Sequence, residues 1–160
     1  MAAVGIVEPV SAHYRVAHWM DTNPGGHAVM NSCQLASHWH FAAPIECIWD
    51  GLYAVEAWPK WWRYVIAVDE LERGDDSGMG ALGRYTWGSR LPYRLSFSMR
   101  TTVVDPPQLL EGIAQGELNG LGRWTLAQQG VHTHVRYDWQ VATSGAWMNA
   151  LAPMLAPIFR

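Results

Sequence analysis

Cysteines and charged residues are scarce in this sequence. Cys33 and Cys47 are its only cysteines, too few for a disulfide framework and too far apart for a CxxC metal motif. Cys47 falls in an apolar helical pattern, so we expect it to be buried. Charged residues make up 16% of the chain, the net charge is −3, and no basic stripe is present. Nucleic-acid binding therefore lacks its electrostatic footprint.

Long apolar runs are also missing. No stretch approaches the about 20 apolar residues that a membrane-spanning helix needs, which argues against stable membrane insertion. The N-terminal residues lack the basic start and the unbroken apolar run of a secretory signal peptide. We therefore expect a cytoplasmic protein with reduced cysteines.

Tryptophan is what the chain has in abundance, with 10 in 160 residues, a length that suits one domain with a sizeable core. The stretch EAWPKWW, residues 56–62, holds three of them at i, i+3 and i+4. One helical turn would place Trp58, Trp61 and Trp62 on a single face, and aromatic residues at this spacing are usually core. The alternative is that one or two of them line a ligand pocket.

Residues 1–33 differ from the remainder of the chain. They contain NPGG and scattered histidines, with no sustained period of either kind. We interpret them as a poorly ordered N-terminal extension and residues 34–160 as the folded domain. In that domain, Ala43-Pro44 opens a helix with proline at its first position. The apolar stripe of this helix is Ile45, Ile48, Trp49 and Leu52.

From Tyr64 onward the apolar pattern has period two, which predicts strands. The segments are 64–72, 83–89, 93–104, 109–118, 122–128 and 132–142. A run of strands without intervening helices predicts an antiparallel meander, whose apolar face needs a cover. The final segment, WMNALAPMLAPIFR (147–160), reads as a helix and is the only large element left to supply that cover.

An ordered set of motifs then points to a family. The motifs are Ala43-Pro44 with Trp49, WPKWW at 58–62, LPYRLSF at 91–97, GELNGLGRW at 116–124, YDW at 137–139 and WMNALAP at 147–153. Across Ser37 to Arg160 the chain resembles the START-like, birch-pollen-allergen-like superfamily (SRPBCC), in its bacterial polyketide cyclase/dehydrase-like branch. The resemblance implies an α+β helix-grip fold. In it, a curved antiparallel sheet of about seven strands, two short helices and a C-terminal helix enclose a hydrophobic cavity.

The same resemblance implies a function. Members of the superfamily bind lipids, sterols or aromatic ligands, and a minority are enzymes. We therefore expect the chain to bind or carry a small hydrophobic ligand, aromatic or polyketide-like, in the internal cavity. One alternative is a polyketide cyclase or dehydratase acting in the same cavity. A second alternative is a protein-interaction module, and no cofactor is implied in any of these cases.

Strand alternation predicts which side chains face the cavity. Tyrosine hydroxyls and indole N–H groups would supply its few polar contacts, which suits an aromatic or oxygenated hydrophobe. Gly112, Ala114 and Gly116 share one face of a strand, and if that face points inward it leaves room for a ligand. The expected ligand-binding residues are Trp49, Trp58, Trp62, Tyr85, Trp87, Tyr93, Phe97, Met99, Trp124, Tyr137, Trp139 and Met148.

Catalytic residues do not emerge from the alternation. It turns no histidine, cysteine or carboxylate pair inward, and it places Arg84, Glu111, Glu117 and Arg136 on the outer face. The inward tyrosines would act as acids only with strongly shifted pKa values. GMGALG, residues 78–83, fits GxGxxG, but a charged turn precedes it and a strand follows, which is the wrong context for a dinucleotide. We assign no catalytic residue, and whether the chain is an enzyme stays open.

The C-terminal segment leads to a prediction about assembly. Pro153 and Pro157 each remove a helix N–H, so we expect a short, kinked last helix that leaves one end of the cavity exposed. Exposed apolar surface favours association, and a homodimer that covers this end is expected.

Two pairs of histidines alternate along the first and last strands of the domain. Trp39 and Val135 prefer the core, which sends the neighbouring histidines to the outer face. The resemblance makes these two strands antiparallel neighbours, so the pairs would approach each other. Neutral imidazoles bind zinc, nickel or copper, but no carboxylate or cysteine joins them here. We interpret them as solvated, with a surface metal site as the alternative. The four are His38, His40, His132 and His134.

Overall fold

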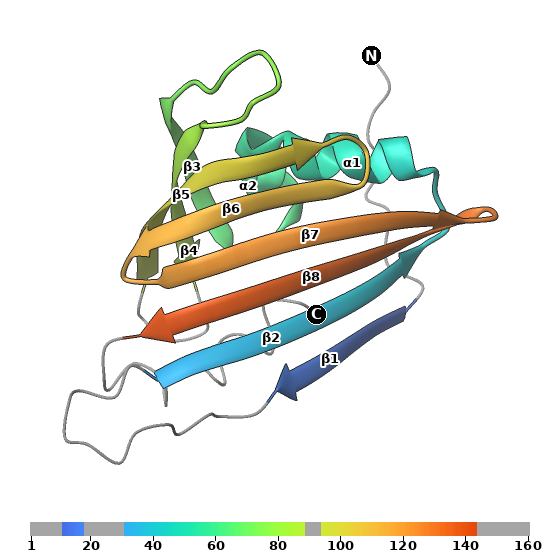
Figure 1. The fold of residues 1–160 in the computed structure, drawn as a ribbon, viewed down its shortest axis with the longest axis horizontal. Helices are drawn as coiled ribbons and strands as arrows, with labels where there is room; N and C mark the ends of the chain where they lie inside the picture. Colours follow the sequence, from blue (N-terminus) through green and yellow to red (C-terminus); the bar gives the residue numbers. More distant parts are fainter. Residues whose placement is uncertain (1–10, 18–30, 89–93, 144–160) are drawn as a thin grey trace.

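Eight antiparallel strands form one sheet in the computed structural model, which describes residues 11–17, 31–88 and 94–143 (Figure 1). They are β1 (Ser11–Ala17), β2 (Asn31–Phe41), β3 (Val65–Glu72), β4 (Leu82–Gly88), β5 (Arg94–Asp105), β6 (Leu109–Gly116), β7 (Asn119–Gln129) and β8 (His132–Thr143). Their order in the sheet is β1-β2-β8-β7-β6-β5-β4-β3. The strands from β3 to β8 pair in sequence, so the predicted antiparallel meander is confirmed.

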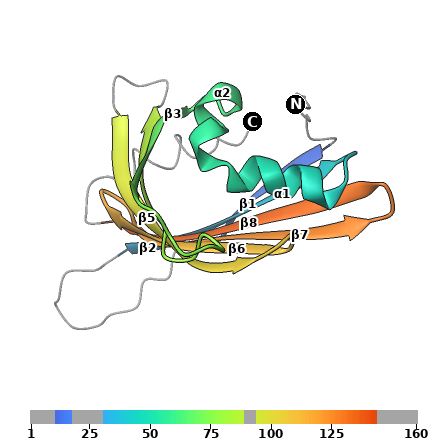
Figure 2. The same cartoon turned by 90° about the horizontal axis from the view of Figure 1, so that it is seen from above.

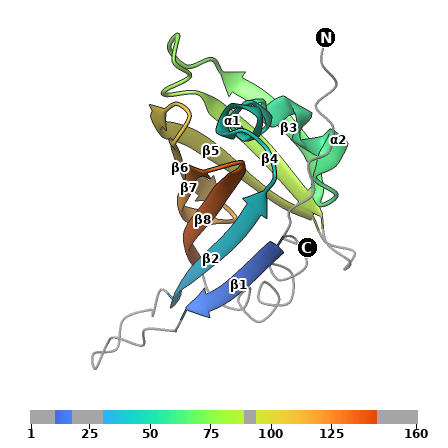
Figure 3. The ribbon, with the colours of Figure 1, turned by 90° about the vertical axis from the view of Figure 1, so that its right-hand side faces the viewer.

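The sheet curves, and its short helices lie on the concave side (Figure 2). These are α1 (Ile45–Tyr53), the 3₁₀ turn η1 (Val55–Ala57) and α2 (Trp58–Trp61). They follow β2 directly, and η1 and α2 pack against β3 at the far end of the sheet. Figure 3 shows β1 and β2 side by side at the opposite edge. The core therefore lies between the concave face and the helices.

The predicted helix is confirmed and its apolar stripe is buried, but the helix begins at Ile45, one residue after the proline that we expected at its first position. Pro44 is the N-cap, with extended backbone angles φ −60° and ψ 147°, and the buried residues of α1 are Ile45, Ile48, Trp49 and Leu52. The prediction that Cys47 is buried was wrong, because its side chain is exposed. Cys47 belongs to the face opposite the stripe, since one residue along a helix turns a side chain by about 100°.

The start of α1 is held by the sheet rather than by a local cap. Pro44 makes no side-chain cap hydrogen bond. Instead the backbone N–H of Ile45 donates to Oε1 of Gln128 on β7 at 2.7 Å. The hydroxyl of Thr133, which is 0% exposed on β8, donates to the carbonyl of Ala43 at 2.7 Å. The first bond gives a partner to an N–H at the helix start that would otherwise lack one, and the two bonds together hold α1 over the ends of β7 and β8.

The structure describes part of the N-terminal segment that we expected to be poorly ordered. Seven strands, β2 to β8, make up the expected sheet, and β1 adds an eighth at its edge. Parts of residues 1–33, which we expected to be a poorly ordered extension, thus form strands: β1, and the first residues of β2. β1 pairs with the backbone groups along the open edge of β2. The domain boundary at residue 34 stays a prediction.

The predicted C-terminal helix lies outside the described residues, as does the homodimer contact expected next to it. Among the residues that are described, no helix combines the length and the apolar character needed to cross a membrane.

Candidate functional site

Among the described residues, nine buried or half-buried aromatic side chains form a continuous group on the concave side of the sheet, which we call the aromatic cluster. They are Trp39, Trp58, Trp62, Tyr85, Trp87, Phe97, Trp124, Tyr137 and Trp139. All but Trp62, which is half-buried, are buried. Each strand contributes alternate residues to this face, because successive side chains along a strand point to opposite sides.

Cross-strand register brings the cluster's rings into contact. Trp124 on β7 lies opposite Tyr137 on β8, and their rings stack with centroids 4.0 Å apart. Tyr85 on β4 lies opposite Phe97 on β5, with stacked rings at 5.6 Å. Aromatic pairs of this kind contribute about 0.5–1.5 kcal/mol each beyond the area that they bury. The concave face is therefore a packed aromatic surface rather than a loose collection of rings.

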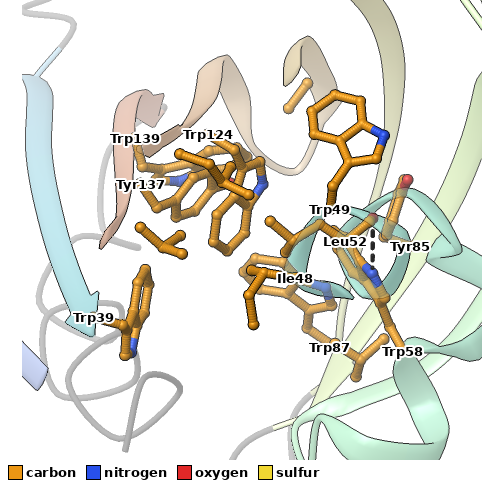
Figure 4. Packing of buried hydrophobic residues seen from close by; sticks show 14 of the residues in the cluster. Trp39, Ile48, Trp49, Leu52, Trp58, Tyr85, Trp87, Trp124, Tyr137 and Trp139 are labelled. Atoms are coloured by element: carbon orange, nitrogen blue, oxygen red, sulfur yellow. Dashed lines mark hydrogen bonds between the residues drawn. The ribbon is translucent and has the colours of Figure 1, made fainter. Parts of the chain in front are cut away.

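The helical turn at α2 adds tryptophans from the other side. Trp58 is 5% exposed, and its indole N–H donates to the carbonyl of Leu52 at 3.2 Å, the bond drawn as a dashed line in Figure 4. Trp62 contacts the rings of Trp87 and Trp124. The expectation that all three tryptophans of this stretch share one buried face was wrong for Trp61, which is 41% exposed. The helix ends at Trp61, and Trp62 leaves it with extended backbone angles.

Two buried polar atoms of the cluster, the indole Nε1 atoms of Trp87 and Trp139, make no hydrogen bond within the part of the chain that the structure describes. These residues are 3% and 2% exposed, and their rings stack with centroids 6.2 Å apart. A buried donor without an acceptor costs about 1–3 kcal/mol, so most native structures satisfy such groups. The two indole N–H groups therefore lack the hydrogen-bond acceptor that buried donors normally have.

The buried tyrosines hold their protons tightly. Burial, with a smaller effect of the Glu56 carboxylate, raises the pKa of Tyr85 to about 12. Burial, with a smaller effect of Tyr85, raises the pKa of Tyr137 well above its ordinary value. The hydroxyls therefore stay protonated at neutral pH, where they can donate or accept hydrogen bonds but serve poorly as bases.

Among the described residues, the tyrosines are the only titratable side chains buried in the cluster, and the Glu56 carboxylate that affects Tyr85 is exposed. Among those residues, the buried polar side chains besides the tyrosines are Ser37 and Thr133. Glu111, on the face of β6 opposite the buried Ala114, accepts from Nε of Arg123 at 2.7 Å, and Glu117, in the turn between β6 and β7, accepts from the backbone N–H of Ser96 at 2.6 Å. The concave face thus offers hydroxyl and indole groups but, within the described residues, no buried carboxylate, imidazole or thiol.

Sequence reasoning missed Ser37. It is 3% exposed and lies opposite Tyr137 in the register between β2 and β8. The signal was available, because Ser37 shares a strand face with the buried Trp39 two residues on. It adds a hydroxyl to the rim of the aromatic cluster.

The small residues on β6 do not leave the space that their size suggested. A Cβ atom at Gly112 would lie 2.9 Å from Cγ of Met99, so the methionine side chain already fills that position. Ala114 is buried, and Gly116 is exposed with a φ of 121°. The relevant close approach is on β7, where a Cβ at Gly122 would meet the ring of Trp139 at 2.5 Å.

The remaining predicted contacts fall in three places. Trp49 is buried on α1 and stacks on Tyr53 at 6.0 Å. Met99 is half-buried against the core. Tyr93 and Met148 lie outside the described residues. The role of each of these side chains as a ligand contact stays a prediction.

A groove lies on another part of the sheet. The groove, about 390 Å³, is open and is lined by Ile113, Leu121 and Gln140 with their neighbours at the ends of β6, β7 and β8. The side chain of Ile113 is exposed, on the face opposite the buried Ala114, so this groove is separate from the aromatic cluster. No group of three or more potential metal ligands occurs in the part of the chain that the structure describes.

Solved structures with the same fold include an aromatase/cyclase. ZhuI from Streptomyces sp. R1128 superposes with a TM-score of 0.62 at 16% identity, over 72% of this chain and 70% of that one. A START superfamily protein from Mycobacterium smegmatis gives a TM-score of 0.66 at 16% identity, over 78% and 87% of the two chains. The di-domain aromatase/cyclase BexL gives 0.60 at 15% identity, over 76% of this chain and 39% of that one. At these identities the likeness shows the fold alone, which is START-like, as predicted.

Sequence comparison adds the family. A search of curated proteins gave no match. The sequence model described as "Polyketide cyclase / dehydrase and lipid transport" matches residues 41–159, which include both helices and the strands from β3 to β8. Because that match covers most of the chain, the protein belongs to the polyketide cyclase/dehydrase and lipid transport family.

Proposed function

We propose that the chain binds or carries a small hydrophobic ligand, aromatic or polyketide-like, that presents an oxygen acceptor to the aromatic cluster. The observation that carries this proposal is the pair of buried, unpartnered indole N–H groups of Trp87 and Trp139. Family membership supports a hydrophobic ligand, because the family's description joins polyketide chemistry with lipid transport.

The composition of the cluster favours a flat ligand with few polar atoms. Its rings offer π-faces and edges for stacking, and its polar groups are hydroxyls and indole N–H groups. A carbonyl or ether oxygen would give an indole N–H the acceptor that none of the described residues supplies. Each such bond is worth about 0.5–1.5 kcal/mol net. A hydrocarbon of the same shape would leave both donors unsatisfied, so the cluster should discriminate by oxygen content.

Native mass spectrometry of the untagged protein, purified from its own organism, tests for a resident ligand. We expect a small hydrophobic molecule bound to a fraction of the protein and released on denaturation. In parallel, titration of purified protein with α-tetralone, a bicyclic aromatic ketone, should change the intrinsic tryptophan fluorescence and saturate. Trp61→Phe serves as the matched control, since it removes an exposed tryptophan and should leave the titration intact. If no bound molecule is found and α-tetralone shows no saturable binding, the proposal is wrong.

Catalysis on the same ligand is the second candidate, which the family description supports as it does binding. Among the described residues, the hydroxyls of Tyr85 and Tyr137 are the titratable groups buried in the cluster. With a pKa of about 12, the Tyr85 hydroxyl would polarise a carbonyl by hydrogen bonding rather than remove a proton. Such an enzyme would fold its substrate for ring closure and rely on positioning.

The discriminating assay offers the protein a linear poly-β-ketone and follows formation of an aromatic ring by absorbance. A rate above the protein-free reaction, reduced in Tyr85→Phe, would favour the enzyme. If α-tetralone binds tightly but the protein does not accelerate ring formation, binding is the only function that remains supported.

A further inference from the structure

Two imidazoles meet on the convex face of the sheet, away from the aromatic cluster. His40 on β2 lies directly opposite His134 on β8 in the antiparallel register. Their ring centroids are 3.5 Å apart, with the ring planes at 67°. Their sequence neighbours Trp39 and Val135 are buried, which places the two histidines on the opposite, outer face.

We propose that His40 and His134 together bind one divalent transition-metal ion, of the copper, nickel and zinc group. Neutral imidazole is a good ligand for all three ions. Imidazole nitrogens bind zinc at about 2.0–2.1 Å, so two ligands of one ion lie within a few ångströms of each other. The ring centroids are 3.5 Å apart, so side-chain rotation that separates them by about an ångström would let one nitrogen of each ring reach the same ion.

The sheet prepares this pair for binding. His40 and His134 lie within two long strands that pair continuously from Asn31 to Phe41, so no loop has to become ordered when the ion binds. A site built on paired strands holds its ligands more precisely than one built on loops. Since no group of three or more potential ligands occurs among the described residues, the pair would supply two ligands and leave other positions to water.

The neighbouring histidines are less suited to the same role. His38 lies opposite Arg136 in the register, and the guanidinium of Arg136 pairs with Asp138 at 2.7 Å. A cation at that position opposes a second cation, and the nearby carboxylate is already engaged. His132 is exposed, two residues along β8 from His134, and lies opposite Gln129 on β7. The structure therefore assigns the site to the His40–His134 pair rather than to the whole group.

Isothermal titration of the untagged full chain with NiCl₂ and with ZnCl₂, at pH 7.5, tests the assignment. We expect one equivalent of metal to bind. His40→Gln and His134→Gln should each weaken binding at least tenfold, and the double variant should bind no more tightly than either single one. His132→Gln is the matched control, on the same strand and face, and should change the affinity less than threefold. No binding by the parent, or equal weakening by His132→Gln and His134→Gln, would overturn the proposal.

A second measurement does not depend on variants. In ¹H–¹⁵N spectra of the parent, substoichiometric Zn²⁺ should shift the imidazole signals of His40 and His134 before those of the other histidines. Uniform shifts of all imidazole signals would contradict a defined pair. The proposal is independent of the hydrophobic ligand, so α-tetralone binding should be unchanged in His134→Gln.

Discussion

Replacing Gly122 with alanine tests whether the aromatic cluster is as tightly packed as the structure has it. Gly122 lies on β7 opposite Trp139, and an added Cβ would stand 2.5 Å from Cζ3 of that ring and 2.9 Å from the hydroxyl oxygen of Tyr137. Ordinary contacts begin near 3.4 Å, so the ring would have to move by about an ångström. Trp139 is 2% exposed and contacts Phe97 and Trp87, so its displacement disturbs the cluster.

The expected cost follows from that geometry. Overpacking a well-packed core costs about 1–3 kcal/mol, and a rigid indole between other rings puts this site at the upper end. Replacing glycine in a strand returns about 0.5–1 kcal/mol by restricting the unfolded chain. We expect Gly122→Ala to lower the free energy of unfolding by about 2 kcal/mol. With a urea slope of about 1–3 kcal/mol per molar, the midpoint should fall by about 1 M.

Urea unfolding followed by tryptophan fluorescence measures this change, with Gly51→Ala as the matched control. Gly51 lies in α1, and a Cβ there would meet nothing within 4 Å. The control should therefore raise stability by about 0.5–1 kcal/mol through helix propensity. If Gly122→Ala is as stable as the parent, the ring of Trp139 does not pack over β7 as described, and the reasoning about the cluster fails.

Three further predictions concern stability. Gln128→Ala removes the oxygen that accepts the Ile45 N–H and should cost about 1 kcal/mol in urea unfolding, whereas an unchanged midpoint would show that water replaces it. Thr133→Val leaves the carbonyl of Ala43 without its donor and should cost about 1–3 kcal/mol in the same assay; a neutral effect would mean that the carbonyl finds another donor. The pKa of Tyr85 is raised to about 12 when folded, against an ordinary value of 10.0, so its contribution is present below pH 10 and is lost as the pH rises toward 12. The loss should reach about 2–3 kcal/mol, and Tyr85→Phe should lose correspondingly less between about pH 9 and 11.5; equal losses would contradict the shift.

The elements that could be predicted from the sequence are those with a clear period. The alternation from Tyr64 onward located the strands β3 to β8, and the stripe of Ile45, Ile48, Trp49 and Leu52 located α1. Both succeed because one face of each element is buried, which imposes the period directly on the residues. Family membership could also be predicted, because several motifs typical of the family occur in a fixed order along the chain.

What could not be predicted depends on contacts between distant residues. The cap of α1 comes from Gln128, 83 positions away from Ile45, so no local motif signals it. Met99 fills the space beside Gly112 because β5 and β6 are neighbours, and their side chains compete for one volume. Trp61 is exposed because α2 ends after one turn, which the spacing of the tryptophans did not show. The contact of His40 with His134 required the exact register of β2 against β8.

We propose that the aromatic cluster binds an oxygen-bearing hydrophobic ligand through the indole N–H groups of Trp87 and Trp139. The most direct measurement is the ratio of dissociation constants for tetralin and α-tetralone, which share a carbon skeleton and differ in one carbonyl. The parent should prefer α-tetralone by up to about tenfold, the worth of one hydrogen bond. In the Trp87→Phe, Trp139→Phe double variant, which keeps aromatic rings but removes both N–H donors, the ratio should fall toward one, while Trp61→Phe should keep the parent's ratio. Equal affinities of the parent for the two ligands, or an unchanged preference in the double variant, would contradict the account.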